Sequence, residues 1–411
     1  MDIVHSGFDK LEVSFSGAVP LSVRLRLHEA KERAAASGMP EFIDLNGVPV
    51  WVKDKGASGG YEFVFDTGPE GEMWAFKNDD DPEKWNFRCV VSAVRCAVDG
   101  WEGVRDRLRG QLKAWRVRRP AGQREASLAR IDYAVDFMSD GFVPDPMRVV
   151  CHWKSDPCER EFTTTIDDVR WRRGVPTSVT IGKLPGRQVQ IYDKTKEVAA
   201  SQKVERQREL WGFCPVKGQR VWRVEVRAGK DLLTRAKIRT FEDAEERLGT
   251  LLGECLEKVR LVTDVDVSNI SRAKTVPEWV EVRRIVSEAI PNADGAVDMS
   301  RVVEGRRADL GDVYRKQIIG CAVAYAHTTG RDAADFLKVM PGEIEADIKA
   351  AFATDRSALL DKFRRASARL KFTDDPPVTE PNGGSFNGDG AASWAGALHR
   401  MRPGYSATCT A

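Results

Sequence analysis

The sequence lacks most of the features that mark secreted, membrane-bound or zinc-binding proteins. It has no run of about 18 or more consecutive apolar residues, which excludes a predicted transmembrane helix. The stretch from Met1 to His5 has neither the basic start nor the apolar run of a signal peptide. None of the eight cysteines forms a Cys-x-x-Cys pair, so we expect reduced thiols and no zinc site. These absences predict a cytoplasmic protein with no membrane partner.

Net charge is also nearly absent. The 64 lysines and arginines are almost balanced by 62 aspartates and glutamates, which leaves a formal net charge of +2. Composition alone therefore does not indicate nucleic-acid binding, although charge is unevenly distributed along the chain. Hydrophobic residues make up 42% and charged residues 31%, values typical of a globular protein with a sizeable core. A chain of 411 residues is expected to contain two or three domains.

Three stretches show the period-two alternation of half-buried strands: residues 130–137, 188–194 and 221–227. In each stretch the apolar residues occupy one face and the polar residues the other. The polar faces carry Arg130, Asp132 and Asp136, then Gln188, Gln190, Tyr192 and Lys194, then Arg223, Glu225 and Arg227. If the three strands belong to one sheet, a tyrosine, a lysine, three carboxylates and several arginines share one surface. The alternative is an ordinary antiparallel sheet with one solvated face.

The order of these motifs resembles the Rep-trans family, the replication initiation factors of rolling-circle plasmids and filamentous phages, with related relaxases of integrative elements. The motifs are RIDYAVDF, then SVTIGK with QVQIYDKTKE, then VWRVEVR. The family pattern is an Arg-x-Asp-x-x-x-Asp strand, a strand ending in Tyr-Asp-Lys, and a strand with Arg-x-Glu. The resemblance covers about residues 1–240 and implies that this segment is a DNA-nicking domain.

The resemblance also implies a type of metal site and a set of partners. Other rolling-circle nucleases bind their metal with a His-x-His pair, and none of the five histidines of this chain forms one. The Rep-trans family instead places carboxylates at its metal, which agrees with that absence. The implied partners are origin DNA, single-stranded or cruciform, a second copy of the chain in a homodimer, and a host helicase.

Tyr192 is the predicted nucleophile. Attack by its phenol on a phosphodiester would give a 5′-phosphotyrosyl intermediate, which a free 3′-hydroxyl can later reverse. Because a free phenol has a pKa of about 10, a nearby cation would help it to ionise. Lys194 lies two residues further along the same predicted face, and we expect it to serve in this way.

Carboxylates and arginines of the same face are the predicted ligands of a metal and of the phosphate. Hard oxygen donors favour Mg²⁺ or Mn²⁺, which would polarise the phosphate. The expected metal ligands are Asp132, Glu225 and Asp136. The arginines expected to orient phosphate oxygens are Arg130, Arg223 and Arg227.

Two basic groups outside these strands are predicted to contact DNA. A helix over 101–115 has an apolar stripe from Trp101 to Trp115 and an arginine-rich remainder that continues beyond its end. The arginines predicted to contact phosphates are Arg105, Arg109, Arg116 and Arg118. A second group, Arg170-Trp171-Arg172-Arg173, suits stacking of unpaired bases, and Arg172 is its predicted contact. The alternatives are a solvated helix face and a tryptophan that anchors a loop.

The predicted fold class is α+β. An antiparallel sheet with flanking helices is expected over residues 1–240, and a mostly helical region over 241–372. Thr240 with Asp243 resembles a capping box, and further helices are predicted over 279–290, 312–326 and 343–370. The stretch 373–411 is rich in Gly, Pro, Asp and Ser and is predicted to be a disordered tail.

Several functions remain open from the sequence. The motif order favours a metal-dependent DNA strand transferase, an endonuclease-like nicking and closing enzyme that initiates rolling-circle replication. A relaxase of an integrative element would use the same chemistry. A non-enzymatic, sequence-specific DNA-binding protein would use the sheet only as a platform. A metal-dependent nuclease that uses water would not need Tyr192.

Overall fold

The computed structural model describes residues 1–152, 166–172, 174–216, 218–263, 273–290, 297–354 and 356–372. The chain divides into two compact units. One unit comprises Met1–Pro215 and Gln219–Arg315, and the other comprises Val216–Gly218 and Lys316–Ala411. The first unit contains the sheet and all the strand residues predicted to form the site. No helix in the described ranges is long and apolar enough to span a membrane.

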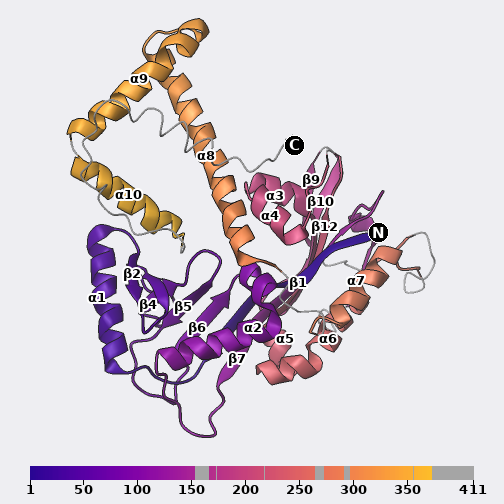
Figure 1. Ribbon diagram of the computed structural model, residues 1–411. Coiled ribbons are helices and arrows are strands. Elements are labelled where there is room, and N and C mark those ends of the chain that lie inside the picture. Colours follow the sequence, from indigo (N-terminus) through magenta and orange to yellow (C-terminus); the bar gives the residue numbers. More distant parts are fainter. Residues whose placement is uncertain are drawn as a thin grey trace. The chain divides into compact units, whose positions relative to one another are not determined.

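One large antiparallel sheet organises the first unit (Figure 1). In the described residues it has eleven strands in the order β2-β3-β4-β5-β6-β1-β7-β12-β11-β10-β9. Their bounds are β1 Asp2–Phe15, β2 Glu41–Asp44, β3 Pro49–Val52, β4 Phe63–Asp66, β5 Glu72–Phe76, β6 Phe87–Val91, β7 Ala126–Met138, β9 Ile166–Arg172, β10 Val175–Gly182, β11 Arg187–Asp193 and β12 Trp222–Gly229. A separate pair joins β8 (Val149–Cys151) to β13 (Val259–Leu261).

The helices complete an α+β fold with a helical C-terminal region, which confirms the predicted class. Their bounds are α1 Leu21–Ser37, α2 Ala93–Ala114, α3 Lys194–Ala200, α4 Val204–Trp211, α5 Lys230–Arg235, α6 Phe241–Lys258, α7 Pro277–Ser287, α8 Met299–Thr328, α9 Ala333–Thr354 and α10 Arg356–Leu370. A short 3₁₀ turn, η1, spans Pro146–Arg148. Within the first unit, α2 packs beside β1, while α5 and α7 pack against β7 (Figure 1).

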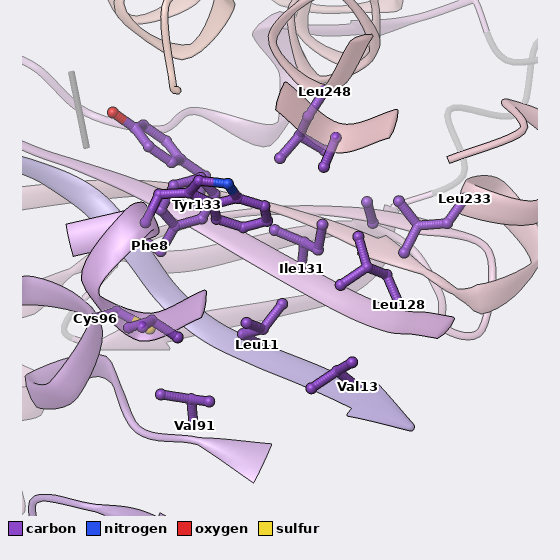
Figure 2. Packing of buried hydrophobic residues seen from close by; sticks show 14 of the residues in the cluster. Phe8, Leu11, Val13, Val91, Cys96, Leu128, Ile131, Tyr133, Leu233 and Leu248 are labelled. Carbon is purple, nitrogen blue, oxygen red and sulfur yellow. The ribbon is translucent and has the colours of Figure 1, made fainter. Parts of the chain in front are cut away.

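The apolar face of the sheet forms the core because each strand alternates its side chains. Leu11 and Val13 of β1 and Ile131 of β7 are fully buried. Figure 2 shows these side chains facing Leu248 of α6 and Leu233 of α5. Each such burial contributes roughly 1.5–3 kcal/mol. The helices on this face leave the opposite, polar face of β7, β12 and β11 to carry the site.

The arginine-rich helix starts earlier than its apolar stripe predicts. Ser92 caps the N-terminus of α2 by accepting a hydrogen bond from the backbone N–H of Arg95. The helix then bends at Gly100, whose φ of 66° lies in the left-handed region that favours glycine. The predicted stripe itself is buried, from Trp101 to Trp115. Because the helix bends at Gly100, the residues before the bend do not continue the apolar stripe. The periodicity therefore did not predict the first two turns of the helix.

The first unit extends beyond the domain boundary expected at residue 240. The predicted capping box is present, with Thr240 and Asp243 bonded reciprocally at the start of α6. The apolar stripe of α6, including Ala244, Leu248 and Leu252, is buried within the same core as the sheet. Because the stripe finds its partner in β11 and β12, α6 belongs with the sheet, and the unit ends at Arg315.

The later helices differ in their limits from the prediction. The segment 312–326 lies inside the longer α8, and the segment 343–370 comprises the end of α9 and the whole of α10. Pro341 lies inside α9, near the point where the predicted helix was expected to start. The predicted tail over 373–411 lies outside the described residues.

Candidate functional site

The three motif strands are neighbours in the sheet, as the sequence predicts. Tyr192 of β11 is the register partner of Arg223 of β12, which is in turn the partner of Asp136 of β7. Arg227 of β12 is the partner of Asp132 in the same way. Residues in cross-strand register point to the same face. The polar residues of all three strands therefore share one surface.

Tyr192 donates a hydrogen bond to Glu225. Its Oη lies 3.4 Å from Glu225 Oε2. Burial raises the pKa of the Tyr192 phenol; Arg223 opposes that shift, and Glu225, Asp9 and Asp136 add to it. The phenol is therefore protonated at neutral pH, and the Glu225 carboxylate is the group placed to accept its proton.

Lys194 does not continue strand β11, contrary to the prediction. Asp193 ends the strand because its carboxylate caps α3, accepting a hydrogen bond of 3.0 Å from the backbone N–H of Lys196. Lys194 is the first residue of α3, and its Nζ lies 5.8 Å from the centroid of the Tyr192 ring. The same Nζ donates to Glu197 Oε2 at 2.6 Å. The lysine is thus beside the tyrosine, yet the pKa of the phenol is raised.

Asp132 and Glu225 are joined through arginines. Arg130 donates to both oxygens of Asp132, at 2.8 and 2.6 Å. Arg227 Nε donates to Glu225 Oε1 at 2.7 Å and lies 3.9 Å from Asp132 Oδ2. Its two remaining nitrogens donate to Gln188 and Gln190, both at 2.8 Å. This network holds two buried carboxylates close together.

The pKa of Asp132 is raised to about 6. Burial is the main cause, and the charge of Glu225 adds to it, while Arg130 and Arg227 oppose the shift. Asp132 is 1% exposed, so little solvent reaches its charge. A carboxyl with this pKa changes its protonation close to neutral pH.

Asp136 belongs to a second network. Arg223 donates to its two oxygens at 2.5 and 2.8 Å, and the indole N–H of Trp211 donates at 2.7 Å. Burial alone would raise the pKa of Asp136, but Arg223 outweighs burial and lowers it, and the hydrogen bond from Trp211 adds to that effect. Arg223 also donates to Asp9 at 2.6 Å. Both oxygens of Asp136 therefore already have protein partners.

Sequence periodicity missed Asp9 and Trp211. The register of β1 against β7 shifts between Phe8 and Lys10, so Asp9 lies at an irregularity of the strand. Trp211 ends α4, a short helix far from β7 in the sequence. A bulge and a long-range contact leave no local pattern, so no signal in the sequence identifies either residue.

The predicted metal ligands are only partly brought together. In the parts of the chain that the structure covers, no three His, Cys, Asp or Glu side chains form a metal-binding group. Asp132 and Glu225 share Arg227, whereas Asp136 is held by Arg223. Mg²⁺ is commonly bound by one or two carboxylates, with water and substrate phosphate as its other ligands. Asp132 and Glu225 lie together, but Arg130 occupies both oxygens of Asp132, and Arg227 and Tyr192 occupy those of Glu225, just as Arg223 and Trp211 occupy those of Asp136. A cation at any of these carboxylates would have to replace such a partner.

The predicted DNA-contacting arginines fall into two groups. Arg105 pairs with Glu245 at 2.6 Å and Arg109 with Glu242 at 2.8 Å, so both connect α2 to α6. Arg116 and Arg118 follow the helix and are exposed. Arg172 is the last residue of β9, and its side chain lies outside the described part of the structure.

The polar face continues from Tyr192 to the edge of the sheet. Ser178 of β10 is the register partner of both Tyr192 and Arg170, so Arg170 of β9 shares the face of the tyrosine. Trp171, the next residue along β9, is 58% exposed and points to the opposite face. The arginine and the tryptophan of this basic group therefore do not share a surface.

Comparison with known proteins gives similar solved structures and no family assignment. No family model matches the sequence, and no curated protein matches it. Among solved structures, the chain is similar to the rolling circle replication initiator protein from Geobacillus stearothermophilus. That similarity has a TM-score of 0.40 at 14% sequence identity, and it covers 72% of this chain and 99% of the other.

Proposed function

We propose that the chain is a DNA strand transferase that nicks and rejoins single-stranded origin DNA, acting as a rolling-circle replication initiator. The observation that carries the proposal is the hydrogen bond from the Tyr192 phenol to Glu225, on a face that also holds Asp132. Arg130 and Arg227 border this pair and remain partly exposed. A nucleophile, a proton acceptor and two partly accessible guanidinium groups are the parts that this chemistry needs.

In the proposed reaction, Tyr192 Oη attacks a backbone phosphorus and its proton passes to Glu225. The bond from phosphorus to the 3′-oxygen breaks, and the leaving oxygen takes a proton from water to become a hydroxyl. The DNA 5′-phosphate is then joined to the tyrosine as a phosphodiester, so the bond energy is conserved. Attack by a free 3′-hydroxyl reverses the step and returns the proton to the phenolate.

The other residues of the site position the reacting groups. Arg130 and Arg227 orient the non-bridging phosphate oxygens, and Lys194 adds positive charge beside the tyrosine ring. Arg223 is buried between Asp136 and Asp9, so it fixes the strands and has no free edge for DNA. Asp132 and Glu225 would hold Mg²⁺ or Mn²⁺ if Arg130 and Arg227 turned from these carboxylates to the phosphate. Such an ion would polarise the phosphate and balance charge on the leaving oxygen.

The test is formation of a covalent adduct. The intact protein is incubated with Mg²⁺ or Mn²⁺ and labelled single-stranded origin oligonucleotides, then run on a denaturing gel. We expect a shifted protein–DNA band that maps to Tyr192. Tyr192→Phe removes only the hydroxyl and should bind DNA without forming the band. An adduct that persists in this variant and maps to another residue would sink the assignment.

Two observations favour a second function. The pKa of Tyr192 is raised, and the guanidinium nitrogens of Arg223 all donate to Asp136 or Asp9. Both features also suit a rigid surface that binds DNA without carrying out chemistry. A non-enzymatic DNA-binding protein would bind the oligonucleotides yet give neither cleavage nor adduct. Cleavage without an adduct would instead indicate a nuclease that uses water. A relaxase would give the same adduct as an initiator and differ only in the DNA sequence it cuts.

A further inference from the structure

A pocket of about 430 Å³ lies against the first half of β1. Four elements or their flanks line it: the first half of β1, the start of α2, the end of α4, and the residues at the start of α8. Its volume is within the range of about 300–1,000 Å³ that is usual for small-molecule sites. The proposed strand-transfer reaction makes no use of it.

The pocket exists because β6 is shorter than β1. In the described residues, β6 pairs only with Leu11–Phe15, so the earlier half of β1 has no strand neighbour on that side. Helices α2 and α4 flank the opening in its place. Trp211 forms part of the wall, and its indole N–H is bonded to Asp136. Asp136 pairs with Arg223, the register partner of Tyr192, so a row of buried contacts links the wall of the pocket to the tyrosine.

Among the described residues, three polar side chains of the pocket have no direct hydrogen bond or ion pair, although Arg301 interacts electrostatically with Asp298, and His5 with Asp136. In the described part of the chain, His5, Glu209 and Arg301 form no hydrogen bond or ion pair with another side chain. Burial lowers the pKa of His5, which stays neutral although Asp136 lies nearby. The remaining charged group, Asp298, accepts hydrogen bonds from Ser300. A pocket in which a few polar side chains stand among apolar ones is typical of a ligand site.

The charges of the pocket select against phosphate and in favour of a neutral heterocycle. Glu209 and Asp298 are negative, Arg301 is positive and His5 is neutral, which gives a net charge of −1. A carboxylate accepts hydrogen bonds from N–H groups, and a guanidinium donates to a carbonyl and a ring nitrogen. Guanine presents both patterns: N1–H and N2–H₂ on one edge, and O6 with N7 on another.

We propose that this pocket binds a guanine base of the DNA strand, next to the nucleotide whose phosphate meets Tyr192. Glu209 accepts from N1–H and N2–H₂, Arg301 donates to O6 and N7, and Trp211 forms the wall against which the base lies. The identification of the ligand as a DNA base rests on the proposed function. The pocket thereby gives the protein a preference for one nucleotide beside the cut.

The first test is binding of the four deoxynucleosides to the intact protein by calorimetric titration. We expect deoxyguanosine to bind about tenfold more tightly than the others, as expected for one good bidentate contact. Glu209→Gln and Arg301→Met should each remove about that factor. Glu304→Gln and Arg315→Met, matched changes on α8 away from the pocket, should leave binding unchanged. Equal binding of all four nucleosides would overturn the proposal.

Filling the pocket gives a variant that is independent of the polar groups. Ala97 lines the pocket from α2, and Ala97→Leu adds volume there with a residue that helices accept well. This variant should fold, shown by an unchanged unfolding midpoint, and should lose deoxyguanosine binding. Wild-type affinity for deoxyguanosine in Ala97→Leu would place the nucleoside elsewhere and overturn the assignment.

Two further binding experiments identify whether the base comes from DNA or from a free nucleotide. Guanosine triphosphate should bind no more tightly than deoxyguanosine, because the pocket is net negative; tighter binding would point to a free nucleotide and overturn the DNA assignment. Oligonucleotides with one abasic site moved along the strand should bind about tenfold more weakly at a single guanine position. Ala97→Leu should abolish that dependence. Both experiments use Tyr192→Phe protein, so failure of the nicking proposal would not affect them.

Discussion

At the scale of single residues, the hydrogen bond from Tyr192 makes Glu225 the proposed acceptor of the phenol proton. Glu225→Gln keeps the size of the side chain and an oxygen that can accept the phenol hydrogen bond, but removes the base. We expect adduct formation to fall by about 10²–10⁴-fold, the usual contribution of a general base, with DNA binding nearly unchanged. Asp168→Asn is the control, an exposed carboxylate on the same face of β9. Equal rates in both variants would remove Glu225 from the mechanism.

Asp132 gives a prediction about pH. Its folded-state pKa of about 6 lies above the ordinary 3.8, so the folded protein binds this proton more tightly than the unfolded chain. Its contribution to stability is therefore present at low pH and is lost as pH rises from about 4 to about 6. Between pH 4 and 7, Asp132→Asn should gain about 2–3 kcal/mol of unfolding free energy relative to the wild type.

Denaturant unfolding of both proteins at several pH values measures this gain. If the unfolding free energies of the two proteins changed with pH in parallel, burial would not raise the pKa of Asp132 in the folded protein. Repeating the series with Mn²⁺ tests the proposed metal site, because a bound cation favours the ionised carboxylate. The metal should then raise the stability of the wild type most at neutral pH, and should have less effect on Asp132→Asn.

The residues of the site were predictable only where a local pattern carried them. The period-two alternation of the strands predicted that Tyr192, Asp132 and Glu225 share one face, and the cross-strand register places them there. Lys194 was assigned to the wrong element because the capping bond of Asp193 ends the strand one residue earlier. Asp9, which pairs with Arg223, depends on a register shift in β1 that no periodicity reveals.

At the scale of elements, α8 supports α4, which carries Trp211. The carboxylate of Asp309 accepts hydrogen bonds from the backbone N–H groups of Glu205 and Arg206, at 2.9 and 3.1 Å. It thus caps the start of α4 from outside the helix. Asp309→Ala should lower the unfolding free energy by about 1 kcal/mol, whereas Asp309→Asn, which keeps an acceptor, should lose less. Denaturant unfolding compares the two, and equal losses would contradict the capping role.

The extents of elements were less predictable than their existence. The apolar stripe from Trp101 to Trp115 identified α2, but the bend at Gly100 separated its first turns from that stripe. The capping box identified the start of α6 correctly. The change to helical character at residue 240 did not mark the end of the unit, because the partner of α6 is a sheet formed much earlier in the chain.

At the scale of the whole molecule, we expect experiments to distinguish the arginines on α2 from the arginines that follow its C-terminal end. Arg116→Gln and Arg118→Gln change exposed residues, and each should make the salt dependence of DNA binding shallower by about one unit. Arg105→Gln and Arg109→Gln remove ion pairs with α6, so they should mainly lower stability, by about 0.2–1 kcal/mol each. Binding titrations over a range of salt concentrations test this, and four equal slopes would contradict it.

The order of the strands has a consequence for synthesis of the protein. The central strand β7 pairs on one side with β1 and on the other with β12, which begins only at Trp222. Tyr192 emerges from the ribosome before Glu225, Arg227 and the strand that holds them. On the proposed function, a nascent chain would carry its nucleophile without the carboxylate that accepts the phenol proton. Competence for strand transfer would then begin only after translation has passed β12.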